Sequence, residues 1–169
     1  FLPGGMGINF VKQFRQAGLA DKIKFLSAFT VDESTLPAQQ DAALGFLGGG
    51  NWAPNMDNPR SKEFVSAYEK EYGAVPATYA FQAYDAINLL DSALKQTKGD
   101  TSNKDALRAA LLKADFKSVR GVFKFNTNHY PIQDFYVVKV AKRPDGKYET
   151  EIVEKVFSKF SDPYAADCP

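Results

Sequence analysis

The sequence predicts an α/β fold: a three-layer α/β/α parallel-sheet lobe or lobes, followed by a C-terminal antiparallel hairpin. In the first 50 residues, short apolar runs alternate with segments of helical periodicity, and right-handed crossovers turn that order into a parallel sheet covered by helices. Near the end, Pro144-Asp145-Gly146 separates two strand-like runs and predicts a hairpin. Phe1 and Leu2 precede a Pro-Gly-Gly turn as the end of a buried strand would, so we expect an incomplete fragment of a larger protein.

The first half of the chain predicts a regular alternation of strands and helices. Phe10, Val11 and Phe14 recur at helical spacing, and Gly18 follows as a helix stop. The expected elements are a helix at Gly7–Ala17, a strand at Ile23–Ala28, a helix at Ser34–Ala43 and a strand at Leu44–Gly48.

The second half predicts paired helices and then the hairpin. Asn58 and Pro59 are typical of an N-cap and a first helical position, and Gly73 is a typical helix end. We also expect a long helix at Thr78–Thr97, a shorter one after the N-cap Asn103, and strands at Gly121–Phe125, Asp134–Ala141 and Lys147–Val153. This change of pattern indicates that the chain passes between two lobes, with crossings expected at Ala74–Pro76 and Lys117–Arg120.

The composition is that of a soluble globular protein with a small partner. The 21 Lys and Arg residues nearly cancel the 20 Asp and Glu residues, so the net charge predicts neither nucleic-acid binding nor attraction to an anionic membrane. No apolar run approaches the roughly 20 residues that span a bilayer. The single cysteine, Cys168, has no partner within the chain, and both a free thiol and pairing with a cysteine elsewhere stay open.

The residues typical of an enzyme or a metal site are missing. His129 is the only histidine and is expected in a surface loop, so we expect no catalytic residues, no metal and no cofactor. The segment Pro3–Gly7 lacks the Gly-Lys-Ser/Thr ending of a phosphate loop, yet its glycines either serve a tight turn or expose helix N–H groups to a ligand. Asp32 and Glu33 are expected at a solvated helix start rather than as an acid–base pair.

Two aromatic residues lie away from the helical core stripes and are candidates for a ligand pocket. Phe29 ends a predicted strand, and Trp52 lies in the glycine-rich loop Gly48–Pro54. Trp52 is equally compatible with an indole that anchors this loop from inside. Core or interlobe packing is expected for the tyrosines on helical faces, Tyr68, Tyr72, Tyr79 and Tyr84.

Several segments resemble the branched-chain amino-acid (Leu/Ile/Val) type of periplasmic binding protein. They are FLPGGMGINFVKQFRQAGL, KIKFLSAFTVDESTL, DAALGFLGGGNW, NPRSKEFVSAYEKEYG and PATYAFQAYDAINLLDSAL. The most specific parts are Tyr-x-x-x-x-Tyr-Asp-Ala at Tyr79–Ala86 and RGVFKFNTN at Arg120–Asn128. The resemblance covers essentially the whole chain and implies a type I periplasmic binding fold, in which two α/β lobes close around a ligand.

The resemblance also implies that this chain is the C-terminal part of such a protein. Residues 1–75 would belong to the second lobe, and residues 76–118 would form helices that return to the first. Residues 119–169 would form a crossing strand, the C-terminal hairpin and a tail.

Ligand contacts are implied at the turn around Met6 and at Phe29-Thr30. Amino-acid binders of this family usually place an acidic side chain where Phe29-Thr30 stand here, and that side chain pairs with the ligand ammonium. Because an unpaired buried ammonium costs several kcal/mol, we expect an aromatic carboxylate stacked on Phe29 or Trp52 in preference to a branched-chain amino acid. Asp32 or Glu33 in the pocket would reverse this expectation.

The function we expect is that of a periplasmic solute-binding subunit of an ABC importer, which captures a small organic ligand without catalysis. The expected partners are the ligand, the inner-membrane permease and the missing N-terminal half, with self-association of the fragment through exposed sheet edges and apolar surface, and no nucleic acid. Two alternatives stay open. One is a ligand-sensing domain of a receptor or regulator with the same fold, and the other is an α/β enzyme whose catalytic residues lie outside this chain.

Overall fold

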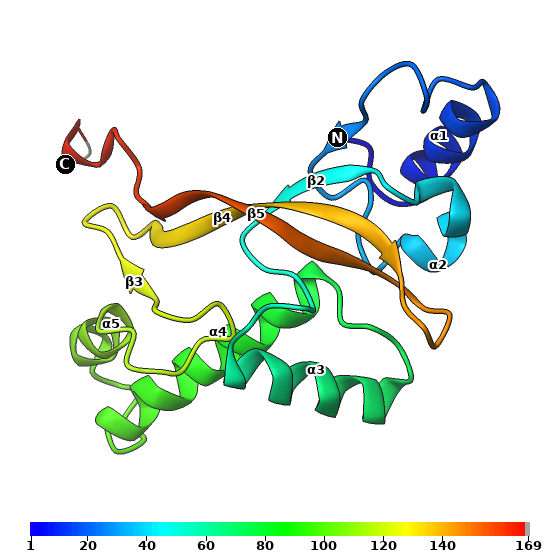
Figure 1. Ribbon diagram of the computed structural model, residues 1–169. Coiled ribbons are helices and arrows are strands. Elements are labelled where there is room, and N and C mark those ends of the chain that lie inside the picture. Colours follow the sequence, from blue (N-terminus) through cyan, green and yellow to red (C-terminus); the bar gives the residue numbers. More distant parts are fainter. Residues whose placement is uncertain (168–169) are drawn as a thin grey trace.

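The computed structural model describes residues 1–167, and its central feature is a five-stranded sheet (Figure 1). The long strand β4 (Pro131–Lys142) lies at the centre. It pairs antiparallel with β5 (Tyr148–Phe160) along most of its length, and with β2 (Leu47–Gly50) and β3 (Lys124–Phe125) over shorter stretches. The short strand β1 (Leu26–Ser27) pairs with β2 in parallel.

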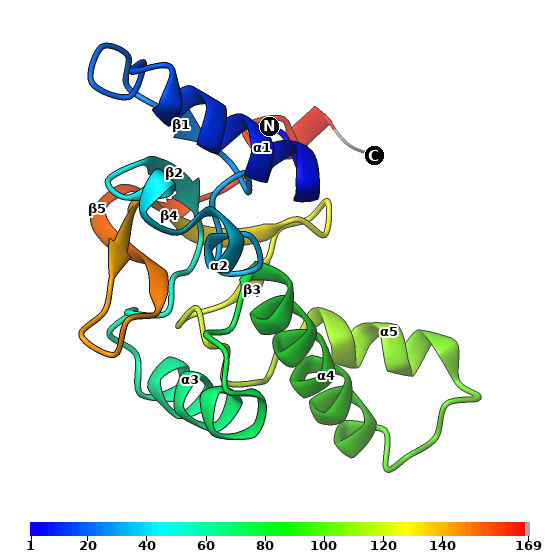
Figure 2. The same cartoon turned by 90° about the vertical axis from the view of Figure 1, so that its right-hand side faces the viewer.

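Helices lie on both sides of this sheet. Helix α1 (Gly4–Gln16) lies on one side, and α3 (Pro59–Tyr72) and α4 (Thr78–Gln96) lie on the other (Figure 2). Helix α5 (Lys104–Leu112) contacts α4. Two short elements complete the first half, α2 (Leu36–Gln39) and the 3₁₀ helix Gln40–Ala43, and a second 3₁₀ helix lies at Ala165–Asp167.

The buried apolar residues form two separate clusters. The first joins α1 to the sheet and consists of Val11, Phe14, Val31, Leu36, Ala43, Phe46 and Val140. The second joins α3 and α4 and consists of Trp52, Met56, Phe64, Phe81 and Val119, with Tyr136 and Ile152 of the hairpin packed against it. We therefore distinguish a sheet unit (residues 1–50 and 131–167) from a helical unit (residues 59–116), which two connecting segments, 51–58 and 117–130, join.

The α/β fold, the parallel β1–β2 pair and the terminal hairpin are confirmed. The helix ends predicted from local signals are also correct, because the side chain of Asn58 accepts from Arg60 N at 2.9 Å and that of Asn103 accepts from Ala106 N at 3.0 Å. Gly73 ends α3 in the left-handed conformation, with φ 68°. His129 lies in an exposed turn, as expected.

Several strand predictions differ from the structure. Phe1 and Leu2 form no strand, because the Leu2 N–H is instead bonded to Thr30 Oγ1 at 3.0 Å. The sheet is mixed rather than parallel throughout, since β4 joins β2 in antiparallel orientation. Both hairpin strands are longer than predicted, whereas β1 has only two residues. The helix expected at Ser34–Ala43 is broken at Gln40, whose φ is 49°.

Within residues 1–167, no helix is both long and apolar enough to cross a bilayer, and no His, Cys, Asp and Glu side chains cluster as metal ligands. The expectation for Cys168 lies outside the described residues.

Candidate ligand-binding site

An apolar cavity of about 480 Å³ lies where the carboxyl ends of β1 and β2 meet the hairpin. This is the edge at which open α/β sheets bind small molecules, and the volume is in the range of ligand pockets. Its lining contains no charged side chain and includes several aromatic rings. The lining residues are Ala28, Phe29, Gly49, Gly50, Asn51, Gln82, Phe135, Tyr136, Val137, Val156, Phe157 and Phe160, and we call this space the aromatic cavity.

Phe29 is the predicted ligand residue that lines the aromatic cavity. Its backbone is in the left-handed region, with φ 61°, a conformation that is strained for a large side chain. The ring packs edge-on against Phe1 at 6.1 Å between centroids and parallel to Tyr79 of α4 at 6.5 Å. Phe29 therefore projects from the sheet unit toward the helical unit.

Thr30 supports this loop from inside. It is buried, and its hydroxyl accepts from Leu2 N. Its carbonyl oxygen accepts from Gln39 Nε2 at 2.7 Å and from Thr35 Oγ1 at 3.2 Å. These contacts hold the backbone next to Phe29, and the Thr30 hydroxyl is already engaged within the protein.

Trp52 and Met6 lie outside the aromatic cavity. Trp52 is 5% exposed, and its indole Nε1 donates to Ser61 Oγ at 2.9 Å within the cluster of α3 and α4. Met6 is exposed on α1. Gly7, which follows Met6, has a packing role, because a Cβ there would lie 2.2 Å from the Leu2 carbonyl oxygen, whereas a Cβ on Gly4 or Gly5 would meet no atom within 4 Å.

The acidic pair beside Phe29 is buried rather than solvated, which corrects the sequence prediction. Asp32 Oδ1 accepts from Ser34 N and Ser34 Oγ. Glu33 Oε1 accepts from Thr150 N at 2.8 Å and Thr150 Oγ1 at 2.6 Å, and burial raises the pKa of Glu33 to about 7. Both residues line a narrow space of about 20 Å³ beside Phe29, but neither lines the aromatic cavity.

Sequence reasoning missed part of the lining. Tyr79, for which packing was expected, packs against Phe29 from the helical unit although it is 66% exposed, and it does not line the aromatic cavity. Phe157 and Phe160 lie on the part of β5 that extends beyond the predicted strand. No alternation past Val153 signalled that extension, because the apolar residues after Val153 recur at intervals of three and four. Gln82 gave no signal either, because its contact depends on how α4 packs against the sheet unit.

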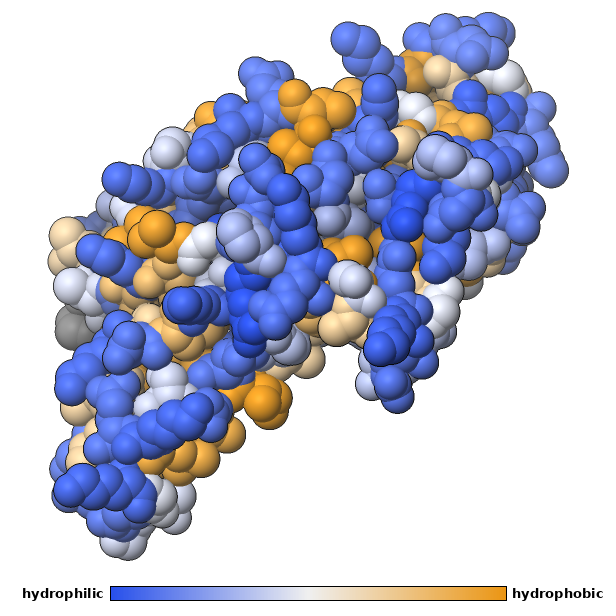
Figure 3. All heavy atoms as spheres, turned by 60° about the horizontal axis from the view of Figure 1, so that its bottom comes forward, coloured by the Kyte–Doolittle hydropathy of each residue, from blue (hydrophilic) through white to orange (hydrophobic). Residues whose placement is uncertain are grey.

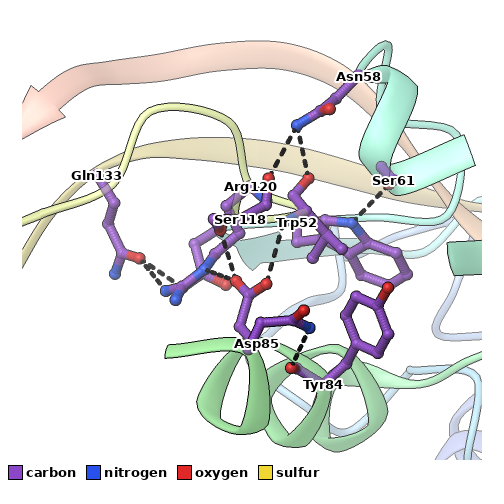
Figure 4. A network of polar contacts seen from close by, with 11 residues as sticks. Trp52, Asn58, Ser61, Tyr84, Asp85, Ser118, Arg120 and Gln133 are labelled. Atoms are coloured by element: carbon purple, nitrogen blue, oxygen red, sulfur yellow. Dashed lines mark hydrogen bonds and ion pairs between the residues drawn. The ribbon is translucent and has the colours of Figure 1, made fainter. Parts of the chain in front are cut away.

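A polar network ties the two connecting segments together beside the aromatic cavity (Figure 4). Asp85 of α4 accepts from Ser118 Oγ at 2.5 Å, Val119 N at 3.0 Å and Arg120 Nε at 3.2 Å. The amide oxygen of Gln133 then accepts from Arg120 Nη1 at 2.8 Å and from Asn51 Nδ2 at 2.9 Å. One network thus joins α4, both connecting segments and β4.

The connecting segments also bond to each other directly. Asn58 Nδ2 donates to the carbonyl oxygens of Ser118 and Val119, at 3.3 and 3.0 Å. Burial lowers the pKa of Arg120, and the Asp85 carboxylate opposes that shift. The two connecting segments therefore cross between the units at one place.

The structure combines a mixed sheet between helices, an apolar cavity at the carboxyl ends of its strands and a paired crossing between two units. Together these features define part of an α/β ligand-binding protein. The sequence model described as "Periplasmic binding protein" matches residues 1–147. The chain belongs to this family, in its branched-chain amino-acid group of type I fold.

Individual relatives agree with this assignment. The chain is 31% identical to the Leu/Ile/Val-binding protein homolog 6 of Brucella melitensis, across 96% of this chain and 43% of the relative. It is 29% identical to an ABC-transporter solute-binding protein of R. palustris solved in complex with benzoate, with a TM-score of 0.86 over 96% of this chain and 43% of the other. A solute-binding protein of Rhodopseudomonas palustris BisB5, in complex with 3,4-dihydroxybenzoic acid, is 35% identical, with a TM-score of 0.83 over 96% and 45%. The chain thus spans less than half the length of these relatives.

Proposed function

We propose that this chain is the later part of a solute-binding subunit of an ABC importer, which captures an aromatic carboxylate between two lobes in the periplasm. The observation that carries the proposal is the aromatic cavity, whose lining holds Phe29, Phe157 and Phe160 and no charged side chain. An aromatic ring would be buried there favourably, whereas an ammonium group would find no carboxylate.

The relatives support the same ligand class. Two similar proteins were solved with benzoate and with 3,4-dihydroxybenzoic acid. The ligand carboxylate would be bound by groups in the remaining part of the protein, because the lining of the aromatic cavity holds no cationic side chain. We infer that the ligand is released unchanged to an inner-membrane permease.

The lobe boundaries are part of this proposal. Helix α3 packs on α4, with Phe64 and Tyr84 4.7 Å apart between ring centroids and Arg60 Nη2 bonded to Asn88 Oδ1 at 3.3 Å. These contacts support a first crossing at residues 51–58, earlier than Ala74–Pro76, so that α3 moves with α4 and α5.

The remaining part of the protein would also cover apolar surface of the helical unit. Ile87 and Leu90 of α4 and Leu112 of α5 are exposed. The surface on this side shows apolar patches between hydrophilic residues (Figure 3). We propose that the other half of the first lobe packs there in the full-length protein.

The direct test is a ligand screen on the full-length protein by thermal shift and calorimetry. Benzoate, 4-hydroxybenzoate, leucine and valine are compared, since a ligand that binds only the folded state raises the melting temperature. We expect stabilisation by the aromatic acids. Stabilisation by leucine or valine alone would refute the proposed ligand class. A membrane or DNA-binding segment in the same polypeptide would instead support the alternative role as a ligand-sensing domain.

A further inference from the structure

An ion pair joins the two units at the end of the hairpin that lies away from the crossing. Arg143 follows β4 in the sheet unit, and its guanidinium contacts Glu69 near the end of α3 through both terminal nitrogens. The Nη2–Oε2 distance is 3.3 Å, and the side chains of Arg143 and Glu69 are 25% and 18% exposed. A two-pronged contact of this kind is stronger and more directional than a single charge contact.

This pair differs from the other ion pairs within residues 1–167. Arg60–Glu63, Lys95–Asp91 and Arg108–Asp105 each lie within one helix. Lys142–Asp41 and Lys155–Asp134 each lie within the sheet unit. Among the described ion pairs, Arg143–Glu69 is the one that joins the sheet unit to α3. Its two residues are 74 positions apart in the sequence.

Arg143 has other partners when the units separate. Its Nη2 lies 3.2 Å from Asp145 Oδ2 and its Nη1 lies 3.4 Å from Glu149 Oε2, and both carboxylates belong to the sheet unit. These two contacts hold the guanidinium in place within its own unit. Separation from Glu69 therefore leaves no unpaired buried charge, which is the condition for a reversible contact.

We propose that Arg143 and Glu69 form a closure latch, a contact that holds the two units together and breaks when they open. The inference rests on the proposed function, because it assumes that the units move to admit a ligand. The same approach of the units places Tyr79 against Phe29. A contact present only in the closed arrangement raises ligand affinity by shifting the population toward closure.

The test uses Glu69→Gln in the full-length protein, with Glu63→Gln as the matched control on the same helix. Small-angle X-ray scattering on ligand-free protein should give a larger radius of gyration for Glu69→Gln than for wild type, and no change for the control. Stopped-flow release of benzoate should be about 3- to 10-fold faster for Glu69→Gln, because mutations within one interface act mainly on dissociation.

A double variant separates the pair from unrelated effects. If the latch acts as described, Arg143→Gln and Glu69→Gln together should accelerate release no more than the stronger single variant. Additive effects, or equal radii and release rates for Glu69→Gln and Glu63→Gln, would overturn the latch. Failure of the wild-type protein to bind benzoate would instead contradict the proposed function, while the scattering comparison would still test the latch.

Discussion

Asp85 and Arg120 lie 3.2 Å apart, between Oδ2 and Nε, at the point where the chain passes from the helical unit to the sheet unit. Asp85 belongs to the Tyr79–Ala86 motif and Arg120 begins the Arg120–Asn128 motif. The two most specific features of the sequence therefore meet in one contact. Asp85 is 3% exposed and holds the backbone of the connecting segment through Val119 N as well. The two motifs therefore hold the crossing between the units together, and neither Asp85 nor Arg120 lines the aromatic cavity.

The first prediction concerns this buried carboxylate. Asp85→Asn should lower the free energy of unfolding by about 2–4 kcal/mol, because Arg120 would then be buried without its charge partner. Urea denaturation of the full-length protein measures the effect. Asp91→Asn removes an exposed carboxylate of the same helix and should cost less than about 0.5 kcal/mol. Equal effects of the two substitutions would show that the crossing does not depend on the Asp85 contacts.

The parts of the fold that could be predicted are those specified locally. Asn58 and Gly73 bound α3 in the structure as they do in the sequence, because a cap or a left-handed glycine requires only neighbouring backbone. Strand lengths could not be predicted in this way. The extent of β5 depends on its pairing with β4, and the left-handed φ of 49° at Gln40 interrupts a helical pattern that continues through it in the sequence.

The candidate site was predicted only where one residue carried its own signal. Phe29 is an aromatic residue at a strand end, and it lines the aromatic cavity. Trp52 carried a similar signal but is buried, since its loop turns into the helical core. Gln82 was missed because its place in the lining arises from the approach of α4 to the sheet unit, which no local pattern encodes.

The second prediction concerns pH. The pKa of Glu33 is raised by burial from 4.5 to about 7. Between pH 4.5 and about pH 7, Glu33 keeps its proton in the native state but has lost it in the unfolded chain. The contribution of Glu33 to stability is therefore complete below pH 4.5 and is lost as the pH rises through about 7. The expected loss is about 3 kcal/mol. Urea midpoints at several pH values should show this fall in wild type and in Glu63→Gln, and a flatter profile in Glu33→Gln. An unchanged profile in Glu33→Gln would assign the pH dependence to other groups.

The third prediction tests the place of Trp52. Ser61→Ala leaves the buried indole N–H without its acceptor and should cost about 1–3 kcal/mol of stability. Because the indole lies in the core of α3 and α4, benzoate affinity of the folded protein should stay within a factor of about two, a difference too small to represent a lost hydrogen bond. Urea denaturation measures the stability of Ser61→Ala, and calorimetry measures its affinity for benzoate. A loss of affinity at unchanged stability would place Trp52 in the ligand site instead.

The fourth prediction separates binding from stability at Phe29. Phe29→Gly removes the ring from the aromatic cavity and should weaken benzoate binding by about 10- to 100-fold, through lost apolar contact and stacking. The same change relieves a strained backbone with φ 61°, so the free energy of unfolding should change by no more than about 1 kcal/mol despite the lost contacts with Phe1 and Tyr79. Tyr130→Ala, at an exposed aromatic residue outside the aromatic cavity, should alter neither quantity. Wild-type affinity in Phe29→Gly would remove this residue from the site, because no other change in the protein would compensate for an absent cavity wall.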